Sequence, residues 1–179
     1  MIIAVAGLAG SGKNTFGKVM AEKLGYHVVC PTFKDLAKKE GVPLMEFQKK
    51  AREDPNIDKK FDEMLRQEAS KGECVVTTWL GPWMVEADLR IWIDAPEEVR
   101  VKRLAKRDEI SLEEAGKHVK ERDADNRERY MKVYNIDILN HEKFDLVLSS
   151  AENTPEELVE KAIRVLKEKG LLGEIYGSN

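Results

Sequence analysis

Several residue types that mark particular classes of protein are scarce in this 179-residue chain. The two cysteines, Cys30 and Cys74, stand alone without a Cys-x-x-Cys spacing or a histidine cluster, which argues against a disulfide framework, a zinc site and a redox pair. We expect both to be small buried side chains. No apolar run approaches the roughly 18 residues that a membrane span needs, and no basic segment precedes the apolar amino terminus. The sequence therefore predicts a cytoplasmic protein without membrane contact.

An excess of charge of one sign is also missing. The 30 basic and 33 acidic residues nearly cancel to a net charge of −3, which argues against nucleic acid as a partner. Glutamine occurs only at Gln48 and Gln67, whereas lysine and glutamate abound, a balance typical of heat-adapted proteins. With 42% hydrophobic residues, a chain of this length predicts one domain over residues 1–179 with its own core.

Five short runs rich in β-branched residues alternate with helical stretches. Runs that are apolar throughout, rather than at every second position, indicate strands covered on both faces, so we expect a parallel sheet in a three-layer α/β/α fold. Asp54, Ser111 and Thr154 are predicted N-caps, each followed by proline, by an acidic residue at the third helical position, or by both. The predicted strands are 2–6, 27–30, 74–78, 89–94 and 145–149.

The first strand runs directly into a glycine-rich loop and then into a helical segment. This GxxxxGK pattern, in its strand–loop–helix setting, is typical of a loop whose backbone amides wrap a phosphate while the lysine reaches the β and γ oxygens. The sequence therefore predicts a site for a nucleoside triphosphate such as ATP. The residues of the loop are Gly7, Leu8, Ala9, Gly10, Ser11, Gly12, Lys13, Asn14 and Thr15.

The hydroxyl residue of the loop is displaced by one position. Asn14 stands where the general motif has Ser or Thr, and Thr15 follows, as in nucleoside monophosphate kinases. We expect Thr15 to lie beside Mg²⁺ and the phosphates; the alternative is a threonine bonded to its own helix. No acidic residue ends the 74–78 strand. Asp94, at the end of the next strand, is the nearest acidic candidate for the metal, or else it caps the helix that begins at Pro96.

Beyond the loop, the chain resembles archaeal-type cytidylate kinases over residues 1 to about 168. The segments that carry the resemblance include TFKDLAKKEGVPLMEF, DPNIDKKFD, ADLRIWIDAPEEVRVKRLAKR and KERDADNRERYMKVYNIDI. The resemblance implies a P-loop kinase fold with strand order 2-3-1-4-5 and transfer of the γ-phosphoryl of ATP to CMP or dCMP. It further implies that residues 31–71 bind the monophosphate and that residues 103–129 form a lid.

The resemblance also implies roles for four arginines. Arg122 and Arg129 match the family's arginines on the acceptor phosphate, and Arg103 and Arg107 match lid arginines that contact ATP. We interpret two further arginines, Arg100 and Arg127, as solvated helix-face charges paired with glutamate.

The acceptor side departs from the family pattern. Lys34 and Trp79 stand where the family has arginines, and Asn126 stands near the position of an acidic base-contacting residue. Lysine keeps the charge but loses the bidentate fork of arginine. Trp79 either stacks on an acceptor base or packs against Trp83, which we expect in the core.

Two alternatives to a cytidylate kinase remain open. One is a related kinase with another small-molecule acceptor, favoured by Lys34 and Trp79. The other is a nucleotide-gated P-loop ATPase that acts on a macromolecular partner, suggested by the carboxy-terminal extension 170–179.

Overall fold

A parallel sheet forms the centre of the protein. The computed structural model describes residues 1–43, 46–47, 50 and 54–173. Its strands are β1 (Ile2–Ala6), β2 (His27–Val29), β3 (Cys74–Thr77), β4 (Leu89–Asp94) and β5 (Leu146–Ser149). Every pair of neighbours is parallel, and the order is β2-β3-β1-β4-β5. The strand predictions and the order implied by the resemblance are confirmed.

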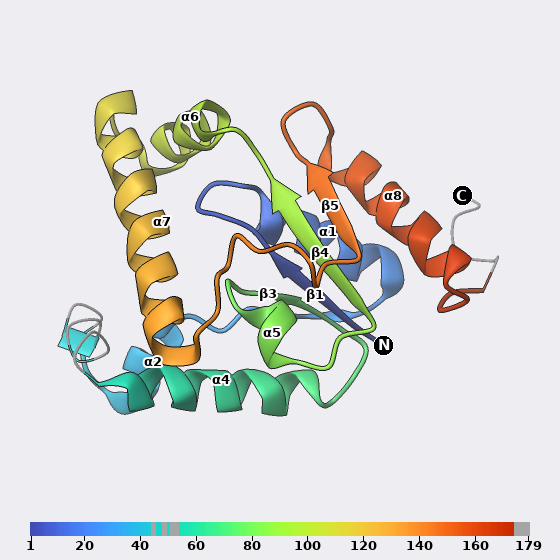
Figure 1. The fold of residues 1–179 in the computed structure, drawn as a ribbon, viewed down its shortest axis with the longest axis horizontal. Coiled ribbons are helices and arrows are strands. Elements are labelled where there is room, and N and C mark those ends of the chain that lie inside the picture. Colours follow the sequence, from blue (N-terminus) through green and yellow to red (C-terminus); the bar gives the residue numbers. More distant parts are fainter. Residues whose placement is uncertain (44–45, 48–49, 51–53, 174–179) are drawn as a thin grey trace.

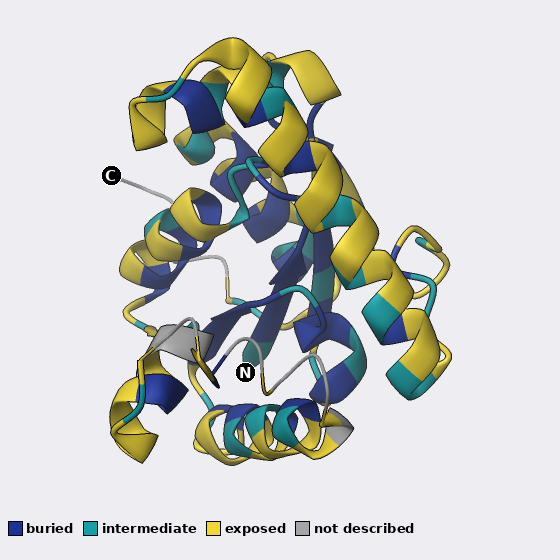
Figure 2. Ribbon diagram, turned by 90° about the vertical axis from the view of Figure 1, so that its left-hand side faces the viewer, coloured by how far each residue is buried: buried dark blue, intermediate teal, exposed yellow. Residues whose placement is uncertain are grey.

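Helices cover both faces of this sheet (Figure 1). On one face α1 (Lys13–Leu24) and α8 (Pro155–Glu168) pack on a core that includes Phe16 and Ile91. The other face is covered by α4 (Pro55–Ala69), α5 (Gly81–Met84) and part of α7 (Leu112–Tyr134). Figure 2 shows buried strands between helices whose outer surfaces are exposed. The predicted three-layer arrangement is thus confirmed.

Two long excursions leave the sheet at the carboxyl ends of its strands. The first contains α2 (Phe33–Glu40) and α4, and the second pairs α6 (Glu97–Asp108) with α7. Apolar contacts through Leu104, Ala115 and Val119 hold α6 against α7. Both excursions are helical where described, as expected, while their roles as acceptor-binding part and lid stay predictions.

The predicted N-caps are confirmed. Asp54 accepts a hydrogen bond from the Asn56 amide at the start of α4. Ser111 and Thr154 each form a capping box with the glutamate three residues later, at the starts of α7 and α8. Such a box satisfies two amide donors that a helix start leaves open. No helix within the described residues is long and apolar enough to cross a bilayer.

Cys74 is the first residue of β3 and Cys30 directly follows the neighbouring strand β2; both are free thiols. Cys74 pairs with His27 in the register, three residues before Cys30, which places the two about 10 Å apart along the strands. Cys74 is buried as expected. The expectation for Cys30 is wrong, because this residue is only partly buried and its Sγ donates to the Thr77 carbonyl oxygen at 3.2 Å.

Candidate active site

The phosphate-binding loop joins β1 to α1. Gly12 is the N-cap of α1, and the first helical turn contains no acidic residue, so the positive end of the helix dipole is open to an anion. Gly10 has a φ of 78°, and a Cβ on it would lie 2.8 Å from the Arg100 carbonyl oxygen. Only glycine fits there without strain, because both the backbone conformation and the approach of α6 exclude a side chain.

A cavity of about 560 Å³ opens beside the loop, between the carboxyl ends of β2 and β3 and the helices α4 and α7. This position agrees with the general rule that ligands of parallel sheets bind outside the carboxyl ends of the strands. Five residues expected in the site, Lys13, Asn14, Trp79, Arg122 and Arg129, meet in its wall. The full lining is Lys13, Asn14, Cys30, Pro31, Thr32, Asp58, Phe61, Asp62, Thr77, Thr78, Trp79, Leu80, Arg122, Asp125, Asn126, Arg129 and Tyr130.

Lys13 and Trp79 contact each other in this wall. The Lys13 Nζ lies 5.1 Å from the centroid of the Trp79 ring, within the range of a cation–π interaction. Burial, followed by the positive charge of Arg122, lowers the pKa of Lys13 to about 8. A bound phosphate would reverse this effect, because a nearby negative charge favours the ammonium form.

Trp79 packs on the core and also lines the cavity, while its stacking on an acceptor base stays a prediction. It is partly buried and packs on the core cluster beneath α4 and α5, yet it also faces the cavity. Trp83 is partly buried, packs on the same cluster and meets Phe144 edge-on at 5.2 Å, so it lies at the edge of the core in which it was expected.

Arg129 is held in the opposite wall by polar neighbours. It donates to Asn126 Oδ1 at 3.0 Å and to the Tyr130 hydroxyl at 3.2 Å, and its Nε lies 3.8 Å from Asp58 Oδ1. Asn126 in turn donates from Nδ2 to the Arg122 carbonyl oxygen. These contacts set the direction of the Arg129 guanidinium before any ligand arrives.

Two carboxylates of α4 line the same cavity, and the sequence analysis did not single them out. Asp58 and Asp62 are four residues apart and therefore share a helix face. Burial raises the pKa of Asp58, and raises that of Asp62 to about 6, although the Tyr134 hydroxyl donates a hydrogen bond to Asp62. The (i, i+4) spacing in DPNIDKKFD was the available signal, but only the fold shows that this face meets α7.

Three polar atoms of the cavity wall are buried without a hydrogen-bond partner within the described part of the chain. They are Asp58 Oδ2, Thr77 Oγ1 and Thr78 Oγ1. Buried polar atoms are normally paired, so these atoms indicate a polar ligand or water in the cavity.

A second, smaller cavity of about 180 Å³ adjoins the other side of the loop. Its lining includes Gly12, Thr15, Arg103, Ser150 and Asn153. Arg103 donates to Ser150 Oγ at 2.8 Å and to the Ser150 carbonyl oxygen at 2.6 Å, and it also reaches the Ser11 carbonyl oxygen at 3.2 Å. Thr15 is exposed there, in the first turn of α1.

The remaining residues that the sequence analysis discussed do not line either cavity, or they lie outside the part of the chain that the structure describes. Arg107 is exposed and forms a bidentate pair with Asp108. Asp94 does not cap α6, because Pro96 is its N-cap without a side-chain bond. The side chain of Lys34 and residues 174–179 of the extension lie outside what the structure describes. Arg127 is an exposed helix-face charge as expected, but it pairs with Asp137 rather than with a glutamate.

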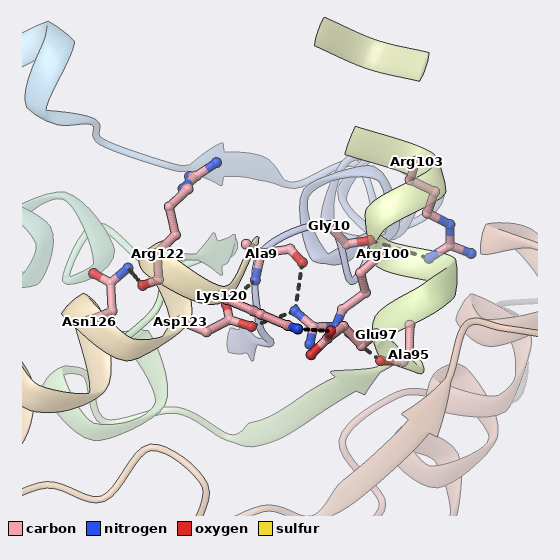
Figure 3. Close-up of polar contacts among 10 residues, drawn as sticks. All are labelled: Ala9, Gly10, Ala95, Glu97, Arg100, Arg103, Lys120, Arg122, Asp123 and Asn126. Carbon is pink, nitrogen blue, oxygen red and sulfur yellow. Dashed lines mark hydrogen bonds and ion pairs between the residues drawn. The ribbon is translucent and has the colours of Figure 1, made fainter. Parts of the chain in front are cut away.

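The interpretation of Arg100 as a solvated charge is wrong. Its side chain is 6% exposed and donates to Asp123 Oδ2 at 2.6 Å, to the Ala9 carbonyl oxygen at 3.1 Å and to the Ala95 carbonyl oxygen at 3.2 Å. Asp123 accepts a further bond from the Ala9 amide at 3.1 Å. Figure 3 shows this group between the loop, α6 and α7, with Arg122 leaving α7 in another direction. A buried guanidinium requires such partners, and they come from distant parts of the sequence.

Five parallel strands in this order, with a glycine-lysine phosphate loop after the first, define the P-loop kinase fold. Shikimate kinase from Acinetobacter baumannii shares the fold with a TM-score of 0.63 at 15% identity, over 96% of this chain and 95% of that one. Deoxyadenosine kinase from M. mycoides aligns with a TM-score of 0.55 at 18% identity, over 94% of each chain.

Sequence comparison makes the assignment narrower. The model of the cytidylate kinase-like family matches residues 2–152. Cytidylate kinase from Pyrococcus horikoshii is 43% identical over 159 residues, which cover 87% of this chain and 83% of that protein. Cytidylate kinase from Thermococcus kodakarensis is 39% identical over 180 residues, 97% and 93% of the two chains. The chain belongs to the cytidylate kinase-like family.

Proposed function

We propose that the protein transfers the γ-phosphoryl group of ATP to CMP or dCMP. The observation that carries this proposal is the cavity beside the phosphate loop, where Lys13 and Arg122 place two positive charges. Within the described residues Arg122 has no ion-pair partner, and its charge lowers the pKa of Lys13. An anion between these two groups would relieve their repulsion, and a phosphoryl group in transfer is such an anion.

The residues divide between donor and acceptor. Lys13 and the loop amides hold the ATP phosphates, with Arg103 beside the smaller cavity, while Arg122 and Arg129 hold the acceptor phosphate. Phosphoryl transfer needs positioning and charge neutralisation rather than a protein nucleophile. A cavity bordered by the loop on one side and α7 on the other meets that requirement. Arg107 would reach the donor only if the tip of the α6–α7 pair closes, as the predicted lid role demands.

The site offers few protein ligands for Mg²⁺, and this ion needs few. No cluster of three or more His, Cys, Asp or Glu side chains that could hold a metal exists within the described residues. Mg²⁺ usually keeps several waters and binds through substrate phosphates with one or two protein groups, so an exposed Thr15 hydroxyl beside the loop is a suitable donor. When bound, the ion would neutralise charge on the phosphate oxygens. A cytoplasmic location would suit an enzyme that uses ATP and CMP, and it stays a prediction.

One assay tests the proposal directly. ADP formation from ATP and Mg²⁺ is measured with CMP, dCMP, UMP, AMP or no acceptor. We expect turnover with CMP and dCMP and only a small background without acceptor. Equal rates in every reaction, including the one without acceptor, would contradict the proposal and favour the ATPase alternative.

A kinase with another acceptor remains the second candidate because of Trp79. An indole provides a stacking surface of about 1–3 kcal/mol for any base but no charge for a phosphate. Preferential turnover of UMP or AMP in the same assay would favour this candidate.

A further inference from the structure

The backbone of Ala9 is held at both its N–H and its carbonyl oxygen by one largely buried ion pair. Its amide donates to Asp123 Oδ1 at 3.1 Å, and its carbonyl oxygen accepts from Arg100 at 3.1 Å. The two side chains also bond each other at 2.6 Å (Figure 3). The loop residue is therefore clamped between α6 and α7.

The clamp also fixes the Ala9 amide in one direction. Because the Ala9 N–H donates to Asp123, it is not among the loop amides that face a phosphate. The loop backbone at Ala9 therefore has one defined orientation. Gly10, the next residue, packs directly on the Arg100 backbone. The loop therefore lies in close contact with the first turn of α6 at this point.

Asp123 is also the neighbour of Arg122 in α7. An anchor at Asp123 therefore sets how far the Arg122 guanidinium lies from the loop, and Arg129 follows about 9–10 Å further along the same rigid helix. Donor and acceptor groups thus share one fixed point. In phosphoryl transfer a misplacement of about 1 Å can lower the rate about a hundredfold.

We propose that Arg100 and Asp123 are positioning residues, which set the shape of the triphosphate loop and its distance from the acceptor-side arginines. This inference rests on the proposed kinase function. It extends that function to two residues that need not touch either substrate.

The test compares Asp123→Asn with Lys120→Gln. Lys120 pairs with Glu97 between the same two helices at 3.5 Å, but both side chains are largely exposed, so its variant controls for loss of an α6–α7 ion pair. We expect kcat of Asp123→Asn to fall about ten- to a hundredfold. The dissociation constant for a nonhydrolysable ATP analogue should rise about two- to tenfold. Lys120→Gln should match the wild type.

A purely structural role is tested by removing both charges. The double variant Arg100→Met/Asp123→Leu leaves no unpaired buried charge and is expected to fold, with melting followed by circular dichroism. Its kcat should be as low as that of Asp123→Asn, because the Ala9 backbone has lost its hydrogen bonds to both side chains. Arg100→Lys, which retains the charge, should recover part of the activity that Arg100→Met loses.

Three results would overturn the proposal: a wild-type kcat in the double variant, kinetics of Asp123→Asn equal to those of Lys120→Gln, or no recovery in Arg100→Lys. Failure of the kinase function itself would look different. In that case the wild type would transfer no phosphoryl group to CMP, while the effect of Asp123→Asn on binding of the ATP analogue would still test the clamp.

Discussion

Replacing Asp62 with asparagine should change how the stability of the protein depends on pH. Burial raises the pKa of Asp62 from its ordinary value of 3.8 to about 6 in the folded protein. The folded state then binds this proton more tightly than the unfolded state. The stabilising contribution of the protonated carboxyl is complete below about pH 4 and is lost as the pH rises through about 6.

The magnitude follows from the difference between these pKa values. About two pH units at about 1.4 kcal/mol each correspond to at most about 3 kcal/mol of unfolding free energy. Asparagine can still accept the hydrogen bond from Tyr134 but does not titrate. The unfolding free energy of Asp62→Asn, minus that of the wild type, should therefore rise by up to about 3 kcal/mol from pH 4 to pH 7. Asp58 is close enough to Asp62 for the two carboxyl groups to titrate together, so the midpoint of the pH dependence describes the pair.

Urea unfolding at pH 4, 5, 6 and 7 measures this difference. Glu63→Gln is the matched control, because Glu63 is the next residue of α4 and is exposed. Tyr134→Phe should shift the wild-type midpoint upward, since the hydroxyl donor that favours the charged carboxylate is gone. The reasoning would be refuted if the unfolding free energy of Asp62→Asn, minus that of the wild type, fell with rising pH. That result would show that Arg129 holds Asp62 in its charged form.

Three substitutions test the site itself. Lys13→Ala should lower kcat about a hundredfold or more without changing the melting temperature, whereas the exposed Lys18→Ala should be neutral; normal turnover would contradict the loop assignment. Trp79→Ala should raise the acceptor KM about five- to 150-fold at a nearly constant ATP KM, with Trp79→Phe close to wild type; an unchanged acceptor KM would leave the indole a packing role only. Gly10→Ala should weaken binding of the ATP analogue more than tenfold, while Gly116→Ala, whose Cβ would have its nearest neighbour 4.0 Å away, should not; equal affinities would disprove the close approach to α6.

The features predicted correctly from the sequence are those that depend on local signals. The strand bounds followed from short apolar runs, and β1 and β4 have the expected ends. The cap at Ser111 followed from a spacing of three residues, and Lys13 followed from a pattern in which strand, loop and helix are contiguous. In each case the residues that decide the structure lie within about ten positions of one another.

The missed features depend on contacts between distant segments. Asp58 and Asp62 face the cavity only because α4 packs opposite α7. Thr77 and Thr78 indicate a polar ligand only because their hydroxyls are buried without partners in the described structure. The local sequence shows at most that Asp58 and Asp62 share a helix face, because burial and partner choice depend on the packing of whole elements.

The arginines show why this distinction matters for function. In the sequence they are equivalent members of helical segments, and the structure separates them by their partners. Asp123 neutralises Arg100 inside the protein, and Asp108 pairs with Arg107 at its surface. Arg122 forms no ion pair with a described residue, although its charge lowers the pKa of Asp108 and, after burial, that of Lys13. An anion bound between Lys13 and Arg122 would interact favourably with both charges, which is what transfer of a phosphoryl group at this place requires.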